Sequence, residues 1–334
     1  MDLSAIFLGT GGSVPSARRS PASVMLVRGG RRTMFDCGEG TQRQLQRSIG
    51  LAQVDEIFLT HFHADHILGL PGLLKTYDLT AREEPLAIYG PRGLRDLFKT
   101  LGRLVGRTDY AIDLVELEPG DAVPHDGAEV RAFAVEHSVR ANGYVLEEAE
   151  RPGRFDPEAA KRAGVAEGPA FAALQRGEEV AGAAGAIRPE QVMGPPRPGR
   201  TVAITGDTSP CHSTVQAAAD AELLVHDASF SEEEAQRAAD TGHSTVAQAA
   251  SVAREAHVKM LALVHISSRY HVGRVLEEAR EVFDATLAPR DFDAIEIPLP
   301  ERGEPALVPD GARERANRAV EAERAPEPDP ESAG

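Results

Sequence analysis

The sequence has few cysteines, no long apolar run and no excess of positive charge, and each absence narrows the class of protein. Only two of its 334 residues are cysteines, Cys37 and Cys211, so we expect no disulfide scaffold and a reducing compartment, the cytoplasm. No apolar run approaches the roughly 18 residues that a membrane span requires. The first residues lack a basic stretch before an apolar one, so we expect no signal peptide.

The charge of the chain is negative overall but unevenly distributed. The formal net charge of −16 by itself argues against a nucleic-acid partner, because binding to phosphates requires Lys and Arg. Residues 1–50, however, carry seven Arg and three acidic residues, and residues 151–200 carry eight Lys or Arg and six acidic residues. A polyanion can therefore still find a positive surface on these two segments.

Short apolar runs alternate with segments of helical periodicity along most of the chain, and 42% of the residues are hydrophobic, enough for a sizeable core. Strands are predicted over 5–8, 23–27, 33–35, 56–59, 86–89, 129–135, 202–205, 223–225 and 261–264. Helices are predicted over 39–49, 92–105, 245–255 and 272–283. This alternation in both halves favours a layered α/β architecture, with two sheets enclosed by helices.

Two stretches break this pattern. Residues 150–199 are rich in Pro, Gly and Ala and show no clear strand, so they are predicted to form a long insertion, which is usually functional or disordered. Residues 309–334 are rich in Glu, Arg, Ala and Pro with almost no large apolar side chains, which predicts a solvated or disordered acidic tail. The main domain is therefore expected over 1–308.

The segment Thr60–His66 contains three histidines and one aspartate, directly after an apolar strand and before a helix. Such a loop can present His61 and His63 from one side and Asp65 and His66 from another. Imidazole and carboxylate groups suit zinc, and also manganese or iron. Packing gives no reason for this density of ligand types, so we interpret the loop as a metal site and not as a polar turn.

One loop cannot complete two metal sites, so further ligands are expected at other strand ends. His137, Asp207 and His265 each come directly after a buried-type strand, and all three side chains could converge on one edge of the sheets. Each residue alone has a simpler explanation as a surface or internally bonded side chain. Together they are the expected partners of the histidine-rich loop.

These residues resemble the metal-binding set of the metallo-β-lactamase superfamily, and within it the chain is similar to the ribonuclease Z family, the tRNA 3′-processing endonucleases, over about residues 2–300. The histidine-rich loop is typical of the whole superfamily, and the sequence motifs around His243 and Arg269 narrow the resemblance to the family. The matching sequence motifs are Phe7–Gly12, Phe35–Gln42, Gly69–Leu73, Gly206–Thr208, Gly242–Thr245 and His265–Tyr270.

The resemblance implies a four-layer αβ/βα metallo-β-lactamase sandwich with a flexible arm at residues 150–199. It also implies two Zn²⁺ ions per subunit, with Mn²⁺ as an alternative, and a bridging role for Asp207. The first zinc would take His61, His63 and His137, and the second would take Asp65, His66 and His265.

The family's chemistry implies that a metal-activated hydroxide attacks a phosphodiester and leaves a 3′-hydroxyl on the tRNA. Asp65 would accept the proton of the water, and His243 would assist the leaving oxygen. His243 could instead be an incidental neighbour of a helix cap at Ser244 or Thr245. Asp36 and His226 would hydrogen-bond to the ligands and orient them, or could be an ordinary turn carboxylate and a strand-end histidine.

Precursor tRNA is the implied substrate and a homodimer the implied assembly. The arm would contact backbone phosphates of the tRNA, although a disordered spacer is the alternative. Arg19 and Arg269 are the predicted substrate contacts in the main domain. The family often carries Pro-Ser-Lys-x-Arg-Asn near the N-terminus, whereas this chain has Ala17 and Ser20 in place of Lys and Asn. This departure leaves open how a precursor with an encoded CCA is treated.

Two other functions are compatible with parts of this pattern. Another hydrolase of the superfamily, of the arylsulfatase, cyclic phosphodiesterase or glyoxalase II type, would act on a small substrate and would not need the arm. A catalytically silent RNA-binding module would normally have lost a metal ligand, whereas all seven matching positions are filled here.

Overall fold

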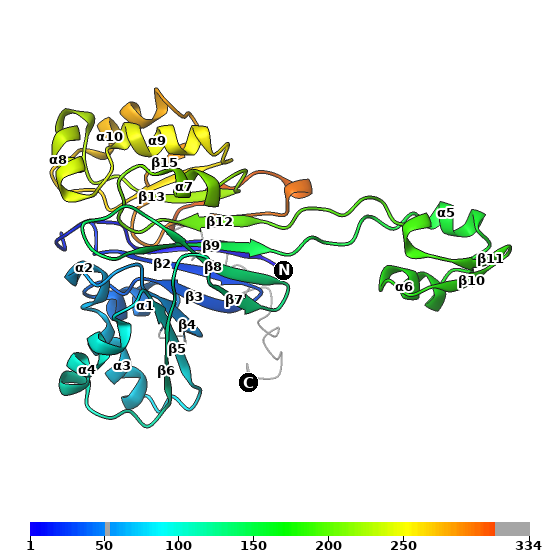
Figure 1. Cartoon of the computed structure of the whole chain (residues 1–334), viewed down its shortest axis with the longest axis horizontal. Coiled ribbons are helices and arrows are strands. Elements are labelled where there is room, and N and C mark those ends of the chain that lie inside the picture. Colours follow the sequence, from blue (N-terminus) through cyan, green and yellow to red (C-terminus); the bar gives the residue numbers. More distant parts are fainter. Residues whose placement is uncertain (51–53, 311–334) are drawn as a thin grey trace, which may run out of the picture.

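The computed structural model describes residues 1–50 and 54–310 and shows two mixed sheets packed face to face, with helices on both outer faces (Figure 1). The first sheet has eight strands in the order β17-β16-β1-β2-β3-β4-β5-β6, and the second has seven in the order β15-β14-β13-β12-β9-β8-β7. The predicted four-layer αβ/βα sandwich is therefore confirmed. Among the described residues, no helix is long and apolar enough to cross a membrane.

The strands of the first sheet are β1 (Leu3–Gly9), β2 (Ser23–Arg28), β3 (Arg31–Phe35), β4 (Glu56–Phe58), β5 (Leu86–Gly90), β6 (Ile112–Glu116), β16 (Ala294–Glu296) and β17 (Ala306–Val308). Those of the second sheet are β7 (Ala122–His125), β8 (Ala128–Ala134), β9 (Asn142–Glu148), β12 (Thr201–Ile204), β13 (Leu223–Asp227), β14 (Leu261–Val264) and β15 (Thr286–Leu287).

Helices cover the outer face of each sheet. The first sheet carries α1 (Thr41–Ser48), α2 (Ala64–Ile67), α3 (Leu70–Leu79) and α4 (Leu94–Val105). The second carries α7 (His212–Ala217), α8 (Ala235–Thr241), α9 (Val246–Glu255) and α10 (Val272–Arg280). The 3₁₀ turn η2 (Glu232–Glu234) precedes α8, and the 3₁₀ turn η3 (Pro300–Arg302) lies near the end of the described chain.

Three hydrophobic clusters hold these layers together. The central cluster lies between the two sheets and includes the stacked rings of Phe35 and Phe58, whose centroids are 5.4 Å apart, and the edge of Tyr144. A second cluster joins the first sheet to its helices, and a third joins the second sheet to α9 and α10. Burial of apolar area in these clusters is the main force that holds the strand ends, and hence the site, in place.

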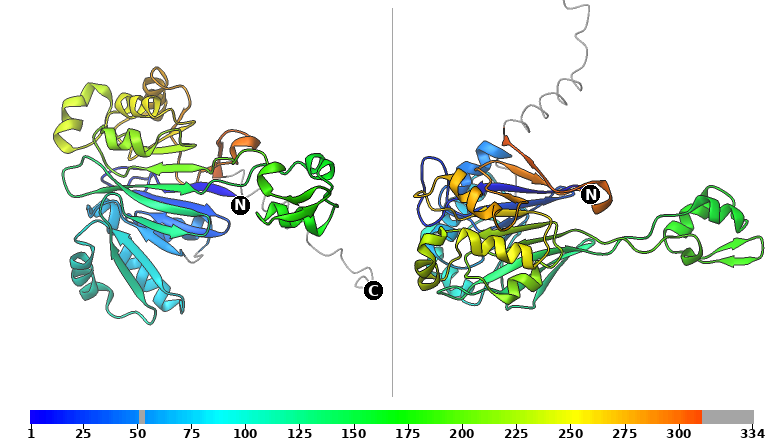
Figure 2. Two further views of the ribbon diagram at one scale, coloured as in Figure 1. Left: turned by 45° about the vertical axis from the view of Figure 1, so that its right-hand side comes forward. Right: turned by 90° about the horizontal axis from the view of Figure 1, so that it is seen from above.

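The segment between β9 and β12 extends away from the sandwich as an arm with a folded head (Figures 1 and 2). The head contains α5 (Pro157–Arg162), α6 (Pro169–Gln175), the strands β10 (Val180–Gly182) and β11 (Gly185–Ile187), and the 3₁₀ turn η1 (Pro189–Gln191). It has its own small core around Leu174 and Val192. The prediction of no strand here was wrong, because β10 and β11 form an antiparallel pair.

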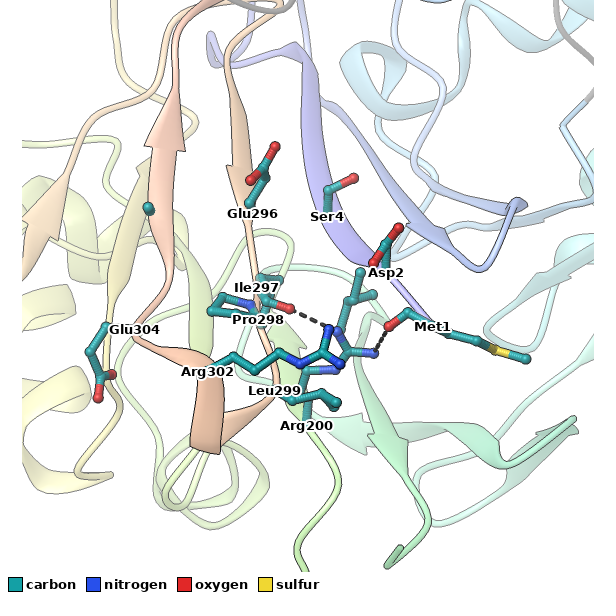
Figure 3. Close-up of a pocket in the computed structure, with 12 residues that line it drawn as sticks. Met1, Asp2, Ser4, Arg200, Glu296, Ile297, Pro298, Leu299, Arg302 and Glu304 are labelled. Atoms are coloured by element: carbon teal, nitrogen blue, oxygen red, sulfur yellow. Dashed lines mark hydrogen bonds between the residues drawn. The ribbon is translucent and has the colours of Figure 1, made fainter.

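Ion pairs fasten both ends of the arm to the sandwich. The side chain of Arg200, which precedes β12, is buried and lies 2.7 Å from that of Glu148, the half-buried last residue of β9. The guanidinium group of Arg200 also donates to the carbonyl oxygens of Ile297 and Met1, beside a cavity of about 450 Å³ (Figure 3). Loss of these Arg200 contacts, at the root where the arm joins the sandwich, would therefore affect the N-terminus, the end of β16 and the arm together.

Some predicted boundaries differ from the structure for local reasons. The helix predicted from residue 39 begins at Thr41, because Gly40 adopts a left-handed φ of 84° and ends the preceding turn. The strand β9 was missed by the sequence analysis, although its first five residues are buried. The predicted tail falls mostly on residues 311–334, which lie outside the described residues.

Candidate metal centre

The seven predicted ligands come from segments at one end of both sheets, and two of them, Asp65 and His66, lie in α2. His61, His63, Asp65 and His66 follow β4, while His137, Asp207 and His265 follow β8, β12 and β14. In the second sheet, β12 runs parallel to β13, which runs parallel to β14, and β8 and β12 are both antiparallel to β9. The strands β8, β12 and β14 therefore end at the same edge, which brings residues from distant parts of the chain together.

The first predicted group, His61, His63 and His137, gathers around Asp207 with ligand atoms within 4.8 Å of one another. His137 Nε2 lies 3.2 Å from His63 Nδ1, and His61 Nε2 lies 3.7 Å from Asp207 Oδ2. Three imidazole nitrogens and one carboxylate oxygen directed at a common point match the usual four-coordinate zinc donor set.

The second predicted group, Asp65, His66 and His265, has ligand atoms within 4.8 Å of one another and also lies close to Asp207. His265 Nε2 is 3.1 Å from Asp65 Oδ2 and 3.4 Å from Asp207 Oδ2. His66 Nε2 is 3.3 Å from Asp207 Oδ1. The carboxylate of Asp207 thus contacts both groups, which is the position that a bridging ligand requires.

Unpaired ligand atoms show that this arrangement suits cations. Among the described residues, His61 Nε2, His66 Nε2 and Asp207 Oδ1 are buried without a hydrogen-bond partner. A buried polar atom without a partner is unfavourable unless an ion or water satisfies it. Burial lowers the pKa of His61 well below its usual value, which keeps the ring neutral and its lone pair available.

The surrounding charge also favours cations. Burial opposes protonation of His66 and His265, but nearby carboxylates, that of Asp207 foremost, outweigh this effect and raise the pKa of both rings. The same rings lower the pKa of Asp207 well below its usual range, against the opposing effect of its burial. The carboxylates therefore create a negative field that divalent cations would neutralise.

Asp36 orients the histidine-rich loop. Its Oδ2 lies 2.7 Å from His66 Nδ1, and its Oδ1 accepts the backbone N–H of Thr60 at 2.8 Å. The Thr60 hydroxyl lies 3.0 Å from His61 Nδ1. With these Nδ1 atoms occupied, the Nε2 atoms of both rings face the centre, which is how an outer hydrogen bond selects the ligating nitrogen.

Two further ligands have the same kind of support. His265 Nδ1 lies 2.6 Å from the hydroxyl of Ser229, and His137 Nδ1 donates to the carbonyl oxygen of Gly242 at 2.7 Å. Gly12 lies against His265 so closely that a Cβ atom there would be 2.6 Å from Nδ1. His265 itself has a left-handed φ of 58°, an unfavourable conformation that functional sites often retain.

His243 lies beside the metal centre, and Asp227 holds its ring. The Nδ1 atom of His243 is 2.8 Å from Asp227 Oδ2, and the other oxygen of Asp227 accepts the Ser229 hydroxyl at 2.6 Å. Burial opposes protonation of His243, but the hydrogen bond and charge of Asp227 outweigh it and raise the pKa to about 9. The nearby cap is Thr245, which accepts the Gln248 N–H and begins α9.

Asp227 and Ser229 are site residues that the sequence analysis missed. The signal was available, because Asp227 is the final residue of a strand whose neighbours β12 and β14 lead to ligands. The predicted orienting residue in this region was His226, whose Nδ1 lies 2.8 Å from the Asp227 carbonyl oxygen. Within the part of the chain that is described, no hydrogen bond joins His226 to a predicted ligand, so its orienting role stays a prediction.

The two predicted substrate contacts have different surroundings. Arg269 is exposed and lines a pocket of about 190 Å³ together with His243 and His265. Arg19 is only 8% exposed, and its Nη1 donates to the Thr10 hydroxyl and the Pro289 carbonyl oxygen. Arg269 lies beside the centre with its Nη1 atom 3.4 Å from Glu234 Oε1, whereas Arg19 mainly fastens its own loop. Both contacts stay predictions.

Comparisons with known proteins give a consistent assignment. The family model of the metallo-beta-lactamase superfamily matches residues 17–256. A ribonuclease Z from Methanosarcina acetivorans is 47% identical over 298 residues, which cover 87% of this chain and 97% of that protein. A ribonuclease Z from Haloferax volcanii is 49% identical over 304 residues, covering 89% of this chain and 96% of that protein.

Solved structures agree with the sequence relatives. The structure of human tRNase Z, short form, superposes with a TM-score of 0.64 and 27% identity, covering 89% of this chain and 99% of that one. The metallo-beta-lactamase fold protein YhfI from Bacillus subtilis has a TM-score of 0.66 at 18% identity, covering 89% and 100% of the two chains, and shares the fold. The chain therefore belongs to the ribonuclease Z family of the metallo-β-lactamase superfamily.

Proposed function

We propose that this chain is a zinc-dependent endoribonuclease that removes the 3′ trailer from precursor tRNA and leaves a 3′-hydroxyl on the tRNA. Its family membership makes it a metal-dependent endoribonuclease, and the choice of ion and RNA is our proposal. The observation that carries the proposal is the convergence of His61, His66 and Asp207, whose buried ligand atoms lack partners among the described residues.

Two zinc ions suit the two groups of ligands, and Asp207 would lie between them. Manganese is also compatible with imidazole and carboxylate donors. When bound, the ions would lower the pKa of a water molecule towards neutrality and neutralise charge on the phosphoryl oxygens. Because Asp65 and Asp207 are the only carboxylates in the ligand set, two dications leave the centre positive, as an anionic phosphodiester requires.

Asp65 is suited to orient the attacking water and to accept its proton. Its Oδ2 accepts the backbone N–H of Ser13 at 2.8 Å and lies 3.1 Å from His265 Nε2. Burial opposes ionisation of Asp65, but His265 and His66 outweigh this effect and hold its pKa well below its usual range. The carboxylate is therefore ionised and can accept a hydrogen bond that orients the water, although the low pKa itself makes it a weak base.

His243 is suited to donate a proton to the leaving 3′ oxygen. Asp227 occupies its Nδ1 atom and favours the protonated ring, which leaves Nε2 for the substrate. Backbone N–H groups of Thr208 and Ser229 and the Ser229 hydroxyl donate to Asp227, so its negative charge is held in a fixed place. Cations bound nearby would lower the pKa of His243 from about 9 towards neutrality, where a general acid is most effective.

The arm is suited to hold the body of the precursor tRNA, and a homodimer is the assembly that we expect. Several basic side chains of the head pair with acids of the head: Lys161 with Glu158 and Glu167, and Arg176 with Glu178. Such exposed pairs contribute little to stability, so phosphates can replace the carboxylates at little cost.

Cleavage of precursor tRNA by wild-type protein and by His63→Ala, with metal content measured in both, tests the proposal. The wild type should bind about two zinc ions and release the trailer, and the variant should lose metal and nearly all cleavage. His212→Ala, at an exposed histidine outside both groups, is the matched control and should behave as wild type. Cleavage of only a small phosphodiester by the metal-loaded wild type would favour another hydrolase of the superfamily.

A further inference from the structure

The 3₁₀ turn η3, which follows β16 of the first sheet, carries an acid that contacts the stalk of the arm. The stalk consists of residues 149–156 and 192–199, the two segments that join the head to the sandwich (Figure 1). Nη1 and Nη2 of Arg151 donate to Oε1 and Oε2 of Glu301, both at 2.8 Å. Nη1 of Arg197, on the other segment, donates to Glu301 Oε1, also at 2.8 Å. One carboxylate thus holds both segments, and we call these contacts the stalk clamp.

The backbone holds the two arginines of the stalk clamp in place. The N–H group of each arginine donates to the carbonyl oxygen of the other, at 2.8 and 2.9 Å. Arg151 Nη2 also donates to the Pro198 carbonyl oxygen at 3.0 Å, and Arg197 Nε donates to that of Pro152 at 3.1 Å. The hydrogen bond from Arg151 lowers the pKa of Glu301 to about 2, so the carboxylate is ionised at neutral pH. The clamp therefore joins opposite charges whose positions are fixed.

The stalk clamp is the polar link between the projecting part of the arm and the sandwich. Across residues 1–50 and 54–310, every hydrogen bond or ion pair that joins residues 151–198 to the sandwich ends at Glu301. The head stands away from the sandwich (Figures 1 and 2). The direction in which the arm projects therefore depends on its root and on Glu301.

Beyond the clamp the stalk is built to be stiff. The Gly194 N–H donates to the Arg154 carbonyl oxygen at 2.7 Å, which keeps the two segments paired. A Cβ atom on Gly153 would lie 1.8 Å from the Gly194 carbonyl oxygen, so the segments are in close contact. Proline fixes the backbone angle φ. The stalk contains four prolines: Pro152, Pro195, Pro196 and Pro198. A small rotation at the root of such a stalk becomes a large displacement of the head.

The segment that carries Glu301 is itself tied to the root of the arm. Nη1 of Arg200 donates to the carbonyl oxygen of Ile297, shortly before η3, at 2.8 Å. Leu299 and Arg302, on either side of Glu301, line the same cavity of about 450 Å³ as Arg200 (Figure 3). The stalk and η3 thus share one base, and the stalk cannot swing away from η3 without breaking the clamp.

We propose that Glu301 is a positioning residue for the cleavage reaction: through Arg151 and Arg197 it sets the direction of the arm, so that the head and the metal centre engage the same tRNA. This inference rests on the proposed function. Two sites on one protein bind one ligand together only when their geometry matches the ligand. Without the clamp the arm would sample other directions, and the apparent affinity falls in proportion to the fraction of matching conformers.

The opposite interpretation is that Glu301 withholds Arg151 and Arg197 from RNA phosphates. Removing the charge of Glu301 would then free two guanidinium groups and strengthen RNA binding. The positioning role predicts weaker binding from the same substitution. The sign of the effect of Glu301→Gln therefore separates the two interpretations.

The distance between the head and the sandwich, measured by electron–electron double resonance on the protein without RNA, tests the clamp directly. Spin labels at the exposed Ala172 and Glu255, in a Cys211→Ser background, report on the direction of the arm. Glu301→Gln should broaden and shift the distance distribution. Glu304→Gln removes the same charge from the same segment, and its side chain has no hydrogen bond or ion pair within the described chain, so this matched control should match wild type. An unchanged distribution in Glu301→Gln would overturn the proposal.

Cleavage kinetics then test whether arm direction matters for the reaction. Glu301→Gln should raise the Michaelis constant for precursor tRNA roughly two- to tenfold, as expected for loss of one or two partly exposed ion pairs. Turnover and hydrolysis of a small phosphodiester should stay unchanged. Combining Arg151→Gln and Arg197→Gln should raise the Michaelis constant similarly, and adding Glu301→Gln should raise it no further.

Two kinetic results would contradict the proposal. A lower Michaelis constant in Glu301→Gln would show that the acid withholds the arginines from RNA. A further rise in the triple variant would show that the arginines and Glu301 act independently. If the wild type cleaved no precursor tRNA, the proposed function would fail, and the distance measurement would still decide whether Glu301 directs the arm.

Discussion

Replacing Asp227 by asparagine separates the chemistry of His243 from metal binding. Asp227 is not among the seven predicted ligands, and its Oδ2 lies 2.8 Å from His243 Nδ1. Asparagine has nearly the same shape but no charge, so the variant keeps the packing and loses the charge-assisted hydrogen bond. A hydrogen bond to a charged group contributes about 1.5–3 kcal/mol, which corresponds to a loss of roughly 10- to 150-fold in turnover.

The combination with His243→Ala sets the upper limit of this effect. Loss of the histidine should cost about two to four orders of magnitude, the usual contribution of acid–base catalysis. Because Asp227 is inferred to act through His243, the double variant should be no slower than His243→Ala alone. Single-turnover cleavage of precursor tRNA under saturating enzyme, with zinc measured in every variant, gives the rates needed.

Two results would refute this reasoning. If Asp227→Asn lost its metal, the carboxylate would be acting on the ligands through Ser229 and not on His243. If the two substitutions slowed turnover by amounts that multiply in the double variant, Asp227 and His243 would be working independently. Near-normal turnover of His243→Ala would show that this histidine has no catalytic role and only lies next to the α9 cap.

Three further predictions concern the arm, its root and Ser229. Replacing residues 155–190 with a short Gly/Ser linker should raise the Michaelis constant for precursor tRNA and leave metal content and small-diester hydrolysis unchanged. Loss of both activities in a folded protein would contradict the view that the arm binds RNA and is not part of the catalytic centre. Burial opposes ionisation of Glu148, but Arg200 and Arg28 lower its pKa to about 2. The ionised carboxylate therefore stabilises the folded protein fully above the usual pKa of 4.5, and this stabilisation is lost as the pH falls towards 2. Urea unfolding should therefore find Glu148→Gln less stable than wild type at pH 7 and less sensitive to acid; equal acid sensitivity would contradict this. Ser229→Ala should weaken zinc binding by about 10- to 100-fold in competition with a chelator, and unchanged affinity would exclude an orienting role.

The layered fold and the grouping of the ligands could be predicted because both leave strong local patterns. Buried strands appear as apolar runs, and the density of ligand types from His61 to His66 has no explanation in packing. His137, Asp207 and His265 were selected as candidate ligands because each directly follows such a strand. Strands that run in the same direction end at the same edge of a sheet, so the residues that follow them are brought together by the fold alone.

Other features depend on contacts that no local pattern records. Asp227 resembles any acid at a strand end until the structure places it 2.8 Å from His243. The strands β10 and β11 have three residues each and are too short for a periodic signal. One cleft is lined by residues such as Arg18 and Arg290, which are far apart in the sequence and meet only after folding.

Cleavage in ¹⁸O-labelled water, followed by mass spectrometry of both RNA products, tests the central claim most directly. Hydrolysis with departure of the 3′ oxygen should place the label in the 5′-phosphate of the trailer and leave an unlabelled 3′-hydroxyl on the tRNA. The label should disappear together with cleavage when the metal is removed and should return when zinc is added. A 3′-phosphate or a cyclic phosphate on the tRNA, or labelled trailer from the metal-free protein, would contradict the account.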